Sequence, residues 1–378
     1  MQIINIAHVV FSFSAGGIEN GIVNLVNNLD PDRYRHTIVC LTKAGEFSEK
    51  IQADNCQIVE LHKKDGNDWK LPLKLRRVFK SNRIDIVHLR GWATLIEGII
   101  GAKLAGVKKI IYGFHGKTIQ DISTRNRKRQ FAEMIAMRFI DRVVTLSEIM
   151  AADYQQYAKI SSTKIQFIYN GVDTDKFNNK INFKETRKEL AINEKDFVIG
   201  SVGRLDPVKD FPTLIKAFSM FSKDICCSKL IIVGDGPERA ALEKLAKELG
   251  VENNTIFTGY RNDIDNLMQA MNVYVQTSLY EGFSNTIVEA MAVGLPVVAT
   301  DVGGNSVLLN NEENGFLIEK QNPKNLKIKL QQLAENSSTR QIISTNNRMK
   351  TLKNFSFPQM VQRYNKLYSE IIQTSTEQ

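Results

Sequence analysis

Short runs of β-branched residues alternate with helical stretches along almost the whole 378-residue chain. Strands that are separated by helices predict βαβ units, in which a parallel sheet carries helices on both faces. The alternation breaks once, at Asn170-Gly171 and the polar stretch that follows, and then resumes. A chain of this length also exceeds what one hydrophobic core usually organises. We therefore predict an α/β fold with two Rossmann-like domains, each built on a parallel sheet.

The same pattern places the individual elements. In the first half the expected strands are Ile3–Val9, Thr37–Cys40, Ile84–His88, Lys109–Tyr112, Val143–Leu146 and Ile165–Tyr169. In the second half they are Phe197–Val202, Lys229–Val233, Thr255–Thr258, Val273–Gln276, Pro296–Ala299 and Phe316–Ile318. Expected helices include Ile18–Leu29, Leu71–Lys80, Thr94–Ala105, Glu148–Tyr157 and the apolar stripe of Phe357–Ile372. We expect domains at residues 1–170 and 171–356, followed by a C-terminal helix within residues 357–378.

Composition is that of an ordinary globular protein, with 43% hydrophobic and 24% charged residues. No apolar run approaches the roughly 20 residues that span a bilayer. The start, MQIINIAHVVFS, lacks the basic residues of a signal peptide and has the apolar pattern of a buried strand. We therefore expect no signal peptide and a cytoplasmic protein. The four cysteines show no C-x-x-C spacing, which favours core thiols over metal ligands or disulfides: Cys40, Cys56, Cys226 and Cys227.

Positive charge concentrates between Lys103 and Arg142, where the net charge is +7. The ten basic residues are Lys103, Lys108, Lys109, Lys117, Arg125, Arg127, Lys128, Arg129, Arg138 and Arg142. Phe131, Met134, Ile135 and Phe139 follow the densest part near helical spacing. A basic patch beside an apolar face can bind an anionic membrane or a phosphorylated acceptor. A solvated helix that packs its apolar side on the core is an equal alternative. Nucleic acid is disfavoured, because aromatic residues are not interleaved with the charges.

The segment from Glu281 to Gly304 carries the strongest functional signal. Glu281 and Glu289 lie eight positions apart, with a small polar turn between them that leads into a helix expected to begin near Asn285. The first N–H groups of a helix lack intrahelical acceptors, and no Glu or Gln follows Ser284 by three residues to form a capping box. Free N–H groups and the helix dipole predict an anion site there, most plausibly for phosphate. The glutamates are suited to accept hydrogen bonds from hydroxyls on either side of it. A diphosphate flanked by hydroxyl groups is a nucleotide sugar.

A second segment, Gly203 to Lys209, brings two cations to the end of an expected strand. The planar guanidinium of Arg204 can donate two parallel hydrogen bonds to phosphate oxygens, and the ammonium of Lys209 is a localised positive charge. Both groups suit a leaving diphosphate. A surface loop with two ordinary cations is the alternative. Its position directly after a strand of a parallel sheet favours the functional interpretation.

Two weaker signals lie in the first half. Gly16 and Gly17 follow the first strand and precede a helix, so the backbone there can approach a ligand, although a tight turn accounts for them equally well. His115, after another expected strand, can hydrogen-bond a sugar hydroxyl or exchange protons near neutral pH. His8, His36, His62 and His88 are less well placed.

Metal binding has little support in the sequence. The pattern D-x-D occurs at Asp30, Asp173 and Asp263, but these three scattered matches are typical of chance. No His or Cys spacing indicates zinc. We therefore expect no metal and no cofactor, with cations and helix N-termini acting on the diphosphate in place of a metal.

These segments together resemble the family 4 glycosyltransferases, bacterial enzymes of the two-Rossmann GT-B architecture. The resemblance covers nearly the whole chain and is most specific in the E-x7-E region with its downstream Gly-Leu-Pro-Val-Val-Ala-Thr and Gly-Gly. Supporting matches are the N-terminal Gly-Gly, Asn-Gly-Val-Asp at 170–173, Gly-Arg-Leu-x-x-x-Lys at 203–209 and Val-Gly-Asp-Gly-Pro-Glu at 233–238. The resemblance implies a cleft between an N-terminal acceptor-binding domain and a C-terminal nucleotide-sugar-binding domain, with the final helix packed back on the former.

The resemblance also implies roles for single residues. Arg204 and Lys209 neutralise the diphosphate, Glu281 holds donor-sugar hydroxyls and Glu289 holds the ribose. Further donor contacts are implied for Gly203, Gly234, Tyr260, Arg261, Phe283, Ser284, Asn285 and Thr286. Gly16, Gly17 and His115 close over the donor from the opposite domain, and His115 stands in a variant of the family's usual surroundings.

The activity expected from the resemblance is metal-independent transfer of a sugar, with retention, from a nucleotide sugar to a glycan or lipid-linked acceptor in bacterial surface polysaccharide or glycoconjugate synthesis. UDP-sugar is the expected donor. A GT-B nucleotide-sugar 2-epimerase is one alternative. A non-catalytic module that binds sugar nucleotides or membrane is another. We expect a cytoplasmic protein that can lie on the inner face of the membrane through residues Lys103–Arg142.

Overall fold

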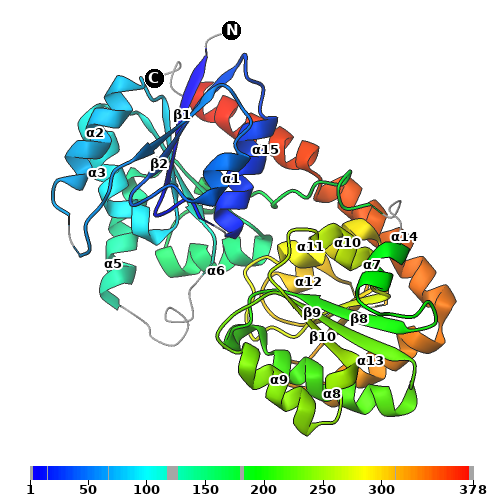
Figure 1. The fold of residues 1–378 in the computed structure, drawn as a ribbon. Coiled ribbons are helices and arrows are strands. Elements are labelled where there is room, and N and C mark those ends of the chain that lie inside the picture. Colours follow the sequence, from blue (N-terminus) through cyan, green and yellow to red (C-terminus); the bar gives the residue numbers. More distant parts are fainter. Residues whose placement is uncertain are drawn as a thin grey trace. The chain divides into compact units, whose positions relative to one another are not determined.

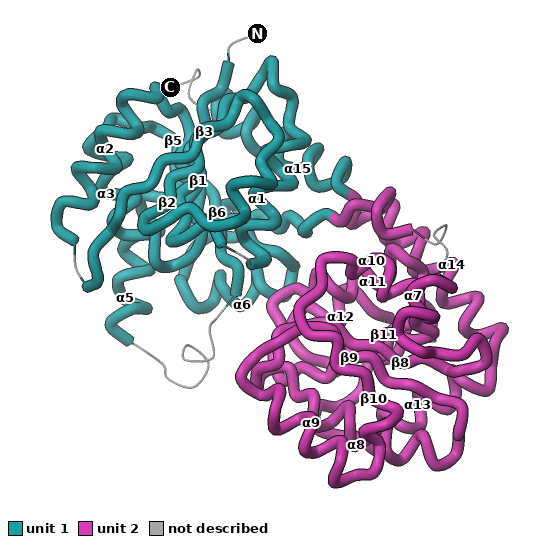
Figure 2. Tube along the Cα trace, in the orientation of Figure 1, with its two compact units in different colours: residues 1–171, 357–378 teal, residues 172–356 magenta. Residues whose placement is uncertain are grey.

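The chain forms two compact units in a computed structural model, and each unit has its own parallel sheet (Figure 1). Unit 1 comprises residues 1–171 and 357–378, and unit 2 comprises residues 172–356 (Figure 2). The structure describes all residues except 1–2, 15, 67, 117–126, 179–182, 311 and 374–378. The predictions that involve Lys117 and Arg125 lie outside the described residues.

The sheet of unit 1 has seven parallel strands in the order β3-β2-β1-β4-β5-β6-β7. They are β1 (Ile4–Val10), β2 (Tyr34–Cys40), β3 (Cys56–Glu60), β4 (Ile86–Arg90), β5 (Lys109–Phe114), β6 (Arg142–Thr145) and β7 (Ile165–Phe167). The helices are α1 (Gly17–Asn28), α2 (Leu71–Ser81), α3 (Leu95–Ala105), α5 (Arg127–Ala136), α6 (Glu148–Ala158) and α15 (Phe357–Gln373). Short 3-10 turns are η1 (Glu46–Lys50), η2 (Trp92–Thr94), η3 (Met137–Phe139) and η4 (Ser162–Lys164).

The last helix, α15, completes the core of unit 1 although it is remote in sequence. Its buried stripe of Met360, Tyr364, Leu367, Tyr368 and Ile371 packs on the first strands and on α1. Helical spacing predicts four of these five residues, but it predicts Val361, which is only partly buried, in place of Met360. Burial of such a stripe is what holds an isolated terminal helix on a domain.

The sheet of unit 2 has six parallel strands in the order β10-β9-β8-β11-β12-β13. They are β8 (Phe197–Val202), β9 (Ser228–Val233), β10 (Thr255–Gly259), β11 (Val273–Gln276), β12 (Val297–Thr300) and β13 (Phe316–Ile318). The helices are α7 (Phe183–Glu189), α8 (Phe211–Asp224), α9 (Arg239–Glu248), α10 (Ile264–Gln269), α11 (Asn285–Val293), α12 (Asn305–Leu308), α13 (Pro323–Glu335) and α14 (Ser337–Asn354). Two 3-10 turns are η5 (Pro207–Lys209) and η6 (Glu252–Asn254).

The predicted α/β fold with two parallel-sheet domains is confirmed. Three strands, β8, β11 and β13, have the predicted bounds, and most others differ by a few residues at their ends. The sequence pattern did not predict β3, an outer strand whose side chains are only partly buried. Its run Cys56–Glu60 is interrupted by polar residues, so it lacks the apolar signal of a strand buried on both faces.

Candidate functional site

The strand order of unit 2 reverses at β8, with β9 and β10 on one side and β11, β12 and β13 on the other. Ligands of open parallel sheets bind at such a switch point, outside the carboxyl ends of the strands. The segment that leaves β8 carries Lys209, and the segment that leaves β11 carries Glu281. The topology therefore brings together two regions that lie 72 positions apart in the sequence.

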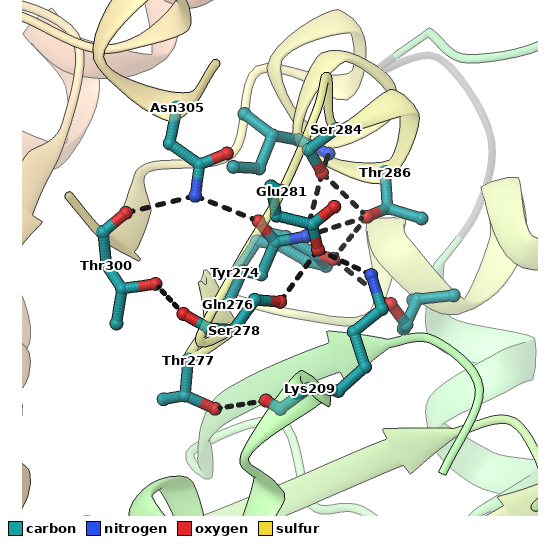
Figure 3. Close-up of polar contacts among 12 residues, drawn as sticks. Lys209, Tyr274, Gln276, Thr277, Ser278, Glu281, Ser284, Thr286, Thr300 and Asn305 are labelled. Atoms are coloured by element: carbon teal, nitrogen blue, oxygen red, sulfur yellow. Dashed lines mark hydrogen bonds and ion pairs between the residues drawn. The ribbon is translucent and has the colours of Figure 1, made fainter. Parts of the chain in front are cut away.

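Lys209 and Glu281 meet directly at this point (Figure 3). Lys209 Nζ lies 2.5 Å from Glu281 Oε1, and the Ser278 hydroxyl donates to the same oxygen at 2.7 Å. The Lys209 side chain is 25% exposed and that of Glu281 is 11% exposed. A buried carboxylate with two donors is well satisfied, while the ammonium keeps donors for a ligand. The loop of Lys209 is fixed further by the Thr277 hydroxyl, which donates to the Lys209 carbonyl at 3.0 Å.

Glycines allow the loops of the site to approach one another closely. Gly303 has φ +50°, and a Cβ on it would overlap the carbonyl oxygen of Glu281. A Cβ on Gly304 would likewise overlap the carbonyl oxygen of Gly282. Gly234, with φ +130°, is pressed in the same way against the carbonyl of Gly203. At each of these positions the backbone of a neighbouring turn occupies the space that a Cβ would need, so only glycine fits.

The start of α11 differs in one respect from the prediction. The helix begins at Asn285 as expected, but the Ser284 hydroxyl caps it by accepting from the Ile287 N–H at 3.3 Å. The sequence correctly predicts that there is no capping box, but serine alone serves as an N-cap, so one of the N–H groups that were expected to be free has a partner. The cap uses only one of the first-turn donors, so the dipole and the remaining turn still favour an anion. Phe283 and Ser284 are buried, and Asn285 and Thr286 are partly exposed.

Glu289 lies on α11, one helical turn beyond the capped end. Its side chain is partly buried, and burial raises its pKa to about 7, with Lys176 lowering the pKa and Asp265 raising it to smaller extents. Lys176 itself contacts Asp265, with Nζ and Oδ1 3.6 Å apart. The Glu289 carboxyl therefore loses its proton near neutral pH. A ligand hydroxyl that donates a hydrogen bond to Glu289 favours the deprotonated carboxylate.

Three other predicted residues are not part of the Lys209–Glu281 contact. Arg204 is exposed in the segment that joins β8 to η5. Tyr260 is 65% exposed after β10. Arg261 is engaged by two carboxylates, at 2.7 Å from Glu189 and at 2.7 Å from Asp263, which raises its pKa. Its guanidinium is therefore held in unit 2 by protein partners, which local sequence does not reveal because Glu189 is 72 positions away.

In unit 1 the predicted residues lie at the carboxyl ends of β1 and β5. Gly16 precedes α1, and a Cβ on it would overlap the Glu19 carboxylate, which folds back over the start of the helix. His115 follows β5 and is partly exposed, and its Nε2 has no hydrogen-bond partner among the described residues. Burial, with a smaller effect of Arg90, lowers the pKa of His115 to about 3. The expectation that His115 exchanges protons near neutral pH is therefore wrong, while a hydrogen bond to a hydroxyl is compatible with its neutral ring.

The sequence pattern did not reveal a group of polar side chains that are buried behind α11. Tyr274 and Gln276 point from β11, and Asn305 points from α12, toward Ser284 and Thr286 (Figure 3). Gln276 is 4% exposed and Asn305 is 0% exposed. A glutamine and a tyrosine inside a predicted buried strand are the signal that could have found them, because buried polar groups require partners.

The basic region of unit 1 is partly described. On α5, Glu133, Ala136 and the following Met137 are buried, whereas Phe131 is 64% exposed and Ile135 is 43% exposed. The apolar residues Phe131 and Ile135 therefore do not pack into the core, and they line a shallow pocket with Arg138, Lys159 and Lys164. Arg129 instead faces the protein, where it pairs with Glu133 and stacks over Trp92.

The described residues offer neither a membrane-spanning helix nor a metal cluster. Over this part of the chain, none of the helices combines the length and apolarity that a membrane crossing needs. Within the same residues, no group of three or more His, Cys, Asp or Glu side chains is placed to hold a metal ion.

Known proteins agree with this architecture. The family model for Glycosyltransferase Family 4 matches residues 15–176, and that for Glycosyl transferases group 1 matches residues 182–350. A UDP-Gal:alpha-D-GlcNAc-diphosphoundecaprenol alpha-1,3-galactosyltransferase of Escherichia coli is 27% identical over 98% of this chain and 97% of its own. An N-acetyl-alpha-D-glucosaminyl L-malate synthase of Bacillus anthracis is 24% identical over 81% of this chain and 80% of its own. Among solved structures, Anabaena HepE in complex with UDP superposes with a TM-score of 0.83 at 23% identity, over 98% of this chain and 100% of HepE.

The two parallel-sheet units, with a cation and a glutamate at the switch point of the second, define a GT-B protein. The two family matches identify the protein family as well as the fold. The chain belongs to the family 4-like GT-B glycosyltransferases, and it is a glycosyltransferase enzyme.

Proposed function

We propose that the protein transfers a sugar from UDP-sugar to a hydroxyl of a lipid-linked or other glycan acceptor, with retention of anomeric configuration and without a metal. The observation that carries this proposal is the contact of Lys209 with Glu281 beside the start of α11. A cation for phosphate, a carboxylate for hydroxyls and a helix N-terminus stand within one small region of unit 2. These are the three kinds of group that a sugar diphosphate needs.

The chemistry follows from where charge develops. As the glycosidic bond to the diphosphate breaks, the anomeric carbon gains positive charge and the leaving group gains negative charge. Lys209 and the first-turn amides of α11 stabilise the leaving diphosphate as its charge grows, and Arg204 adds a second cation from the same loop. Glu281 orients the donor sugar through its hydroxyls, and Glu289 orients the ribose. In our proposal a leaving phosphate oxygen accepts the acceptor's proton on the same face, which gives retention without a carboxylate nucleophile.

The relatives support the choice of donor and acceptor. HepE has been solved with UDP and with UDP-glucose, and the E. coli relative is named for a UDP-Gal donor and a diphosphoundecaprenol acceptor. By this likeness we assign a UDP-sugar to unit 2. We assign a glycan or polyprenyl-diphosphate-linked acceptor to unit 1.

A lipid-linked acceptor places the enzyme at a membrane, and we propose that α5 and η3 make the contact from the cytoplasmic side. Exposed Phe131 and Ile135 beside Arg127, Lys128 and Arg138 form an apolar surface with a basic rim, which matches an anionic bilayer. Phe131→Ser with Ile135→Ser should abolish sedimentation with phosphatidylglycerol vesicles. Ile342→Ser is the matched control, because Ile342 is 60% exposed on α14 of unit 2, outside α5 and η3. Equal sedimentation of all variants would refute the membrane assignment.

Activity assays test the reaction itself. Lys209→Met should lower turnover about 100-fold or more, as the loss of one preorganised charge stabiliser does elsewhere. Lys223→Met, at an exposed position of α8, is the control that should keep full turnover. Release of UDP that depends on acceptor distinguishes a transferase from a non-catalytic module, and isomerisation of UDP-sugar without acceptor would indicate an epimerase. Turnover that survives excess EDTA is expected, and strict dependence on Mn²⁺ would contradict a metal-free mechanism.

A further inference from the structure

Two neighbouring helices of unit 1, α2 and α3, carry large apolar side chains on their solvent side. Trp69, just before α2, is 86% exposed, and Leu73 on α2 is 56% exposed. Ile100 and Leu104 on α3 are 44% and 48% exposed. We propose that these four residues and the cations around them, together the α2–α3 face, bind the surface of an anionic phospholipid bilayer, with Trp69 inserted among the headgroups. The inference rests on the proposed function, because a lipid-linked acceptor places the enzyme at a membrane, and it adds a contact that is separate from α5 and η3.

The spacing of residues along α2 explains why this side of the helix faces solvent. The buried side consists of four apolar residues that pack into unit 1: Leu71, Leu75, Val78 and Phe79. The exposed side recurs at intervals of three and four residues: Leu73, Arg76, Arg77 and Lys80. Turning Leu73 inward would therefore turn the core residues Leu75 and Phe79 into water. Leu73 is thus exposed because the core side of an amphipathic helix is already filled.

The helix α3 lies so close to α2 that their exposed sides form one surface. A Cβ on Gly101 would lie 2.6 Å from Leu75 Cβ and 3.2 Å from the Pro72 carbonyl oxygen, so glycine permits this approach. Arg76 Nε donates to the Leu104 carbonyl at 3.2 Å, which places the C-terminal end of α3 beside the exposed side of α2. The exposed aliphatic side chains therefore stand on a packed pair of helices.

The charge of the α2–α3 face is positive and has no counter-charge of its own. The helix α2 has four basic residues and no acidic one, and only Lys74 is paired, with Asp68 at 3.1 Å. Among the residues that the structure describes, no carboxylate forms an ion pair with the exposed cations of this face: Lys70, Arg76, Arg77, Lys80 and Lys103. An apolar surface surrounded by such cations is attracted to the negative charge of phosphate headgroups.

A bilayer fits this combination better than a second copy of the chain or a nucleic acid does. A two-fold dimer brings the same surface of both copies together, so the cations would face one another. A nucleic acid would meet aliphatic side chains, which do not stack on bases as aromatic rings do. Tryptophan is typical of the boundary between headgroups and hydrocarbon, because its ring is apolar and its N–H can still donate a hydrogen bond.

The α2–α3 face and the surface of α5 can meet the same bilayer. The helix α3 packs against α5 as well as against α2, and Figure 1 shows the three helices along one side of unit 1. Two separate contacts restrict how unit 1 tilts on the membrane. Each contact also raises the effective concentration of the other, so binding through both is much tighter than binding through either one alone.

Trp69 itself reports on the proposed contact, because the chain has only one other tryptophan, Trp92. The variant Trp92→Phe leaves Trp69 as the single emitter. Its emission should shift to shorter wavelength with phosphatidylglycerol vesicles, and lipids brominated near the headgroup should quench it. Phosphatidylcholine vesicles should cause little shift, since they offer the cations no net negative charge. Unchanged Trp69 emission in Trp92→Phe protein that sediments with phosphatidylglycerol vesicles would overturn the proposal.

Sedimentation tests the apolar and the charged parts of the face separately. Leu73→Ser with Leu104→Ser should raise the apparent Kd for phosphatidylglycerol vesicles about 10-fold or more, since burial of one such side chain already contributes about that factor. Arg77→Ser with Lys103→Ser should weaken binding and reduce its dependence on salt. The matched control is Ile328→Ser with Met349→Ser, because these two residues of unit 2 are each 57% exposed. Equal vesicle binding by the wild type and the Leu73/Leu104 variant would contradict the proposal.

Activity assays separate this proposal from the proposed function. The Leu73/Leu104 variant should keep full turnover on a water-soluble glycan acceptor, because the face lies outside the donor site of unit 2. Sugar transfer by a wild type whose Trp69 emission ignores vesicles would overturn the α2–α3 contact alone. A wild type that shows the emission shift but transfers no sugar would overturn the proposed function alone. Emission that shifts with protein concentration in the absence of vesicles would assign the face to a second copy and overturn the bilayer.

Discussion

Acidification should destabilise unit 1 strongly, because three histidines are buried there as neutral rings. His8, His36 and His88 lie on β1, β2 and β4, and each is at most 2% exposed. His8 Nε2 lies 3.2 Å from His36 Nδ1, and His88 Nδ1 lies 3.1 Å from the hydroxyl of Tyr368 on α15. Arg90 Nη2 lies 3.4 Å from His8 Nδ1, so a fixed positive charge already faces the rings.

The sign and the size of the effect follow from linkage. Burial lowers the pKa of His36 to about 4, and burial with the charge of Arg90 lowers the pKa of His8 and His88 well below the usual range. A histidine whose pKa is depressed by folding contributes full stability above its unfolded pKa of about 6.5 and loses it as the pH falls toward the folded pKa. Between pH 7.5 and 5.5 each such ring costs about 1.4 kcal/mol. His115 of the same unit also has a pKa lowered to about 3, so the four rings together lower the free energy of unfolding by about 5.5 kcal/mol.

Tryptophan fluorescence can follow this loss in unit 1 specifically. Both tryptophans of the chain, Trp69 and Trp92, lie in unit 1. Urea unfolding monitored by their emission should show a midpoint that falls steeply from pH 7.5 to 5.5. His88→Gln should reduce the pH dependence by about one quarter, because one of the four protons that these histidines take up on unfolding is lost. A midpoint that does not change with pH, or a His88→Gln variant with an unchanged slope, would refute the assignment of the rings as buried and neutral.

Three further predictions concern unit 2. Gly303→Ala should destabilise unit 2 by several kcal/mol and lower UDP affinity, measured by thermal unfolding and calorimetry, because its Cβ overlaps the Glu281 carbonyl oxygen at a positive φ. Unchanged melting would show that the turn has room to relax. UDP affinity should rise as the pH increases through about 7, where Glu289 becomes the carboxylate that accepts from ribose hydroxyls, and Glu289→Gln should flatten this profile. Ser278→Ala should raise KM for the donor more than it lowers kcat, because the hydroxyl holds Glu281 and not the leaving group. A fall in kcat with constant KM would place Ser278 in the transition state instead.

Much of the fold could be predicted from local sequence, because strands buried on both faces are continuous apolar runs. Phe197–Val202 and Val273–Gln276 are examples, and their bounds match the structure. Lys209 and Gly303 could be predicted to lie at the carboxyl ends of strands, because each follows such an apolar run. The outer strand β3 could not be predicted, because a partly exposed strand lacks the apolar signal.

The rest of the site depends on contacts between residues that are distant in sequence. The cap formed by Ser284 is visible in the local sequence, and Gln276 inside a buried strand indicates that it needs a partner, but its partners Ser284 and Asn305 could not be predicted, since they arrive from other segments of the chain. The engagement of Arg261 by Glu189 is of the same kind. The lowered pKa of His115 could not be predicted either, because its sequence neighbours do not reveal that the fold shields its Nε2 from solvent and brings the ring near Arg90.

A crystal structure with UDP would test the central claim most directly. The account predicts that the diphosphate lies at the carboxyl ends of β8 and β11, with Lys209 Nζ moved from Glu281 to a phosphate oxygen and first-turn amides of α11 donating to the diphosphate. A nucleotide bound away from the start of α11, with the Lys209–Glu281 pair intact, would contradict it.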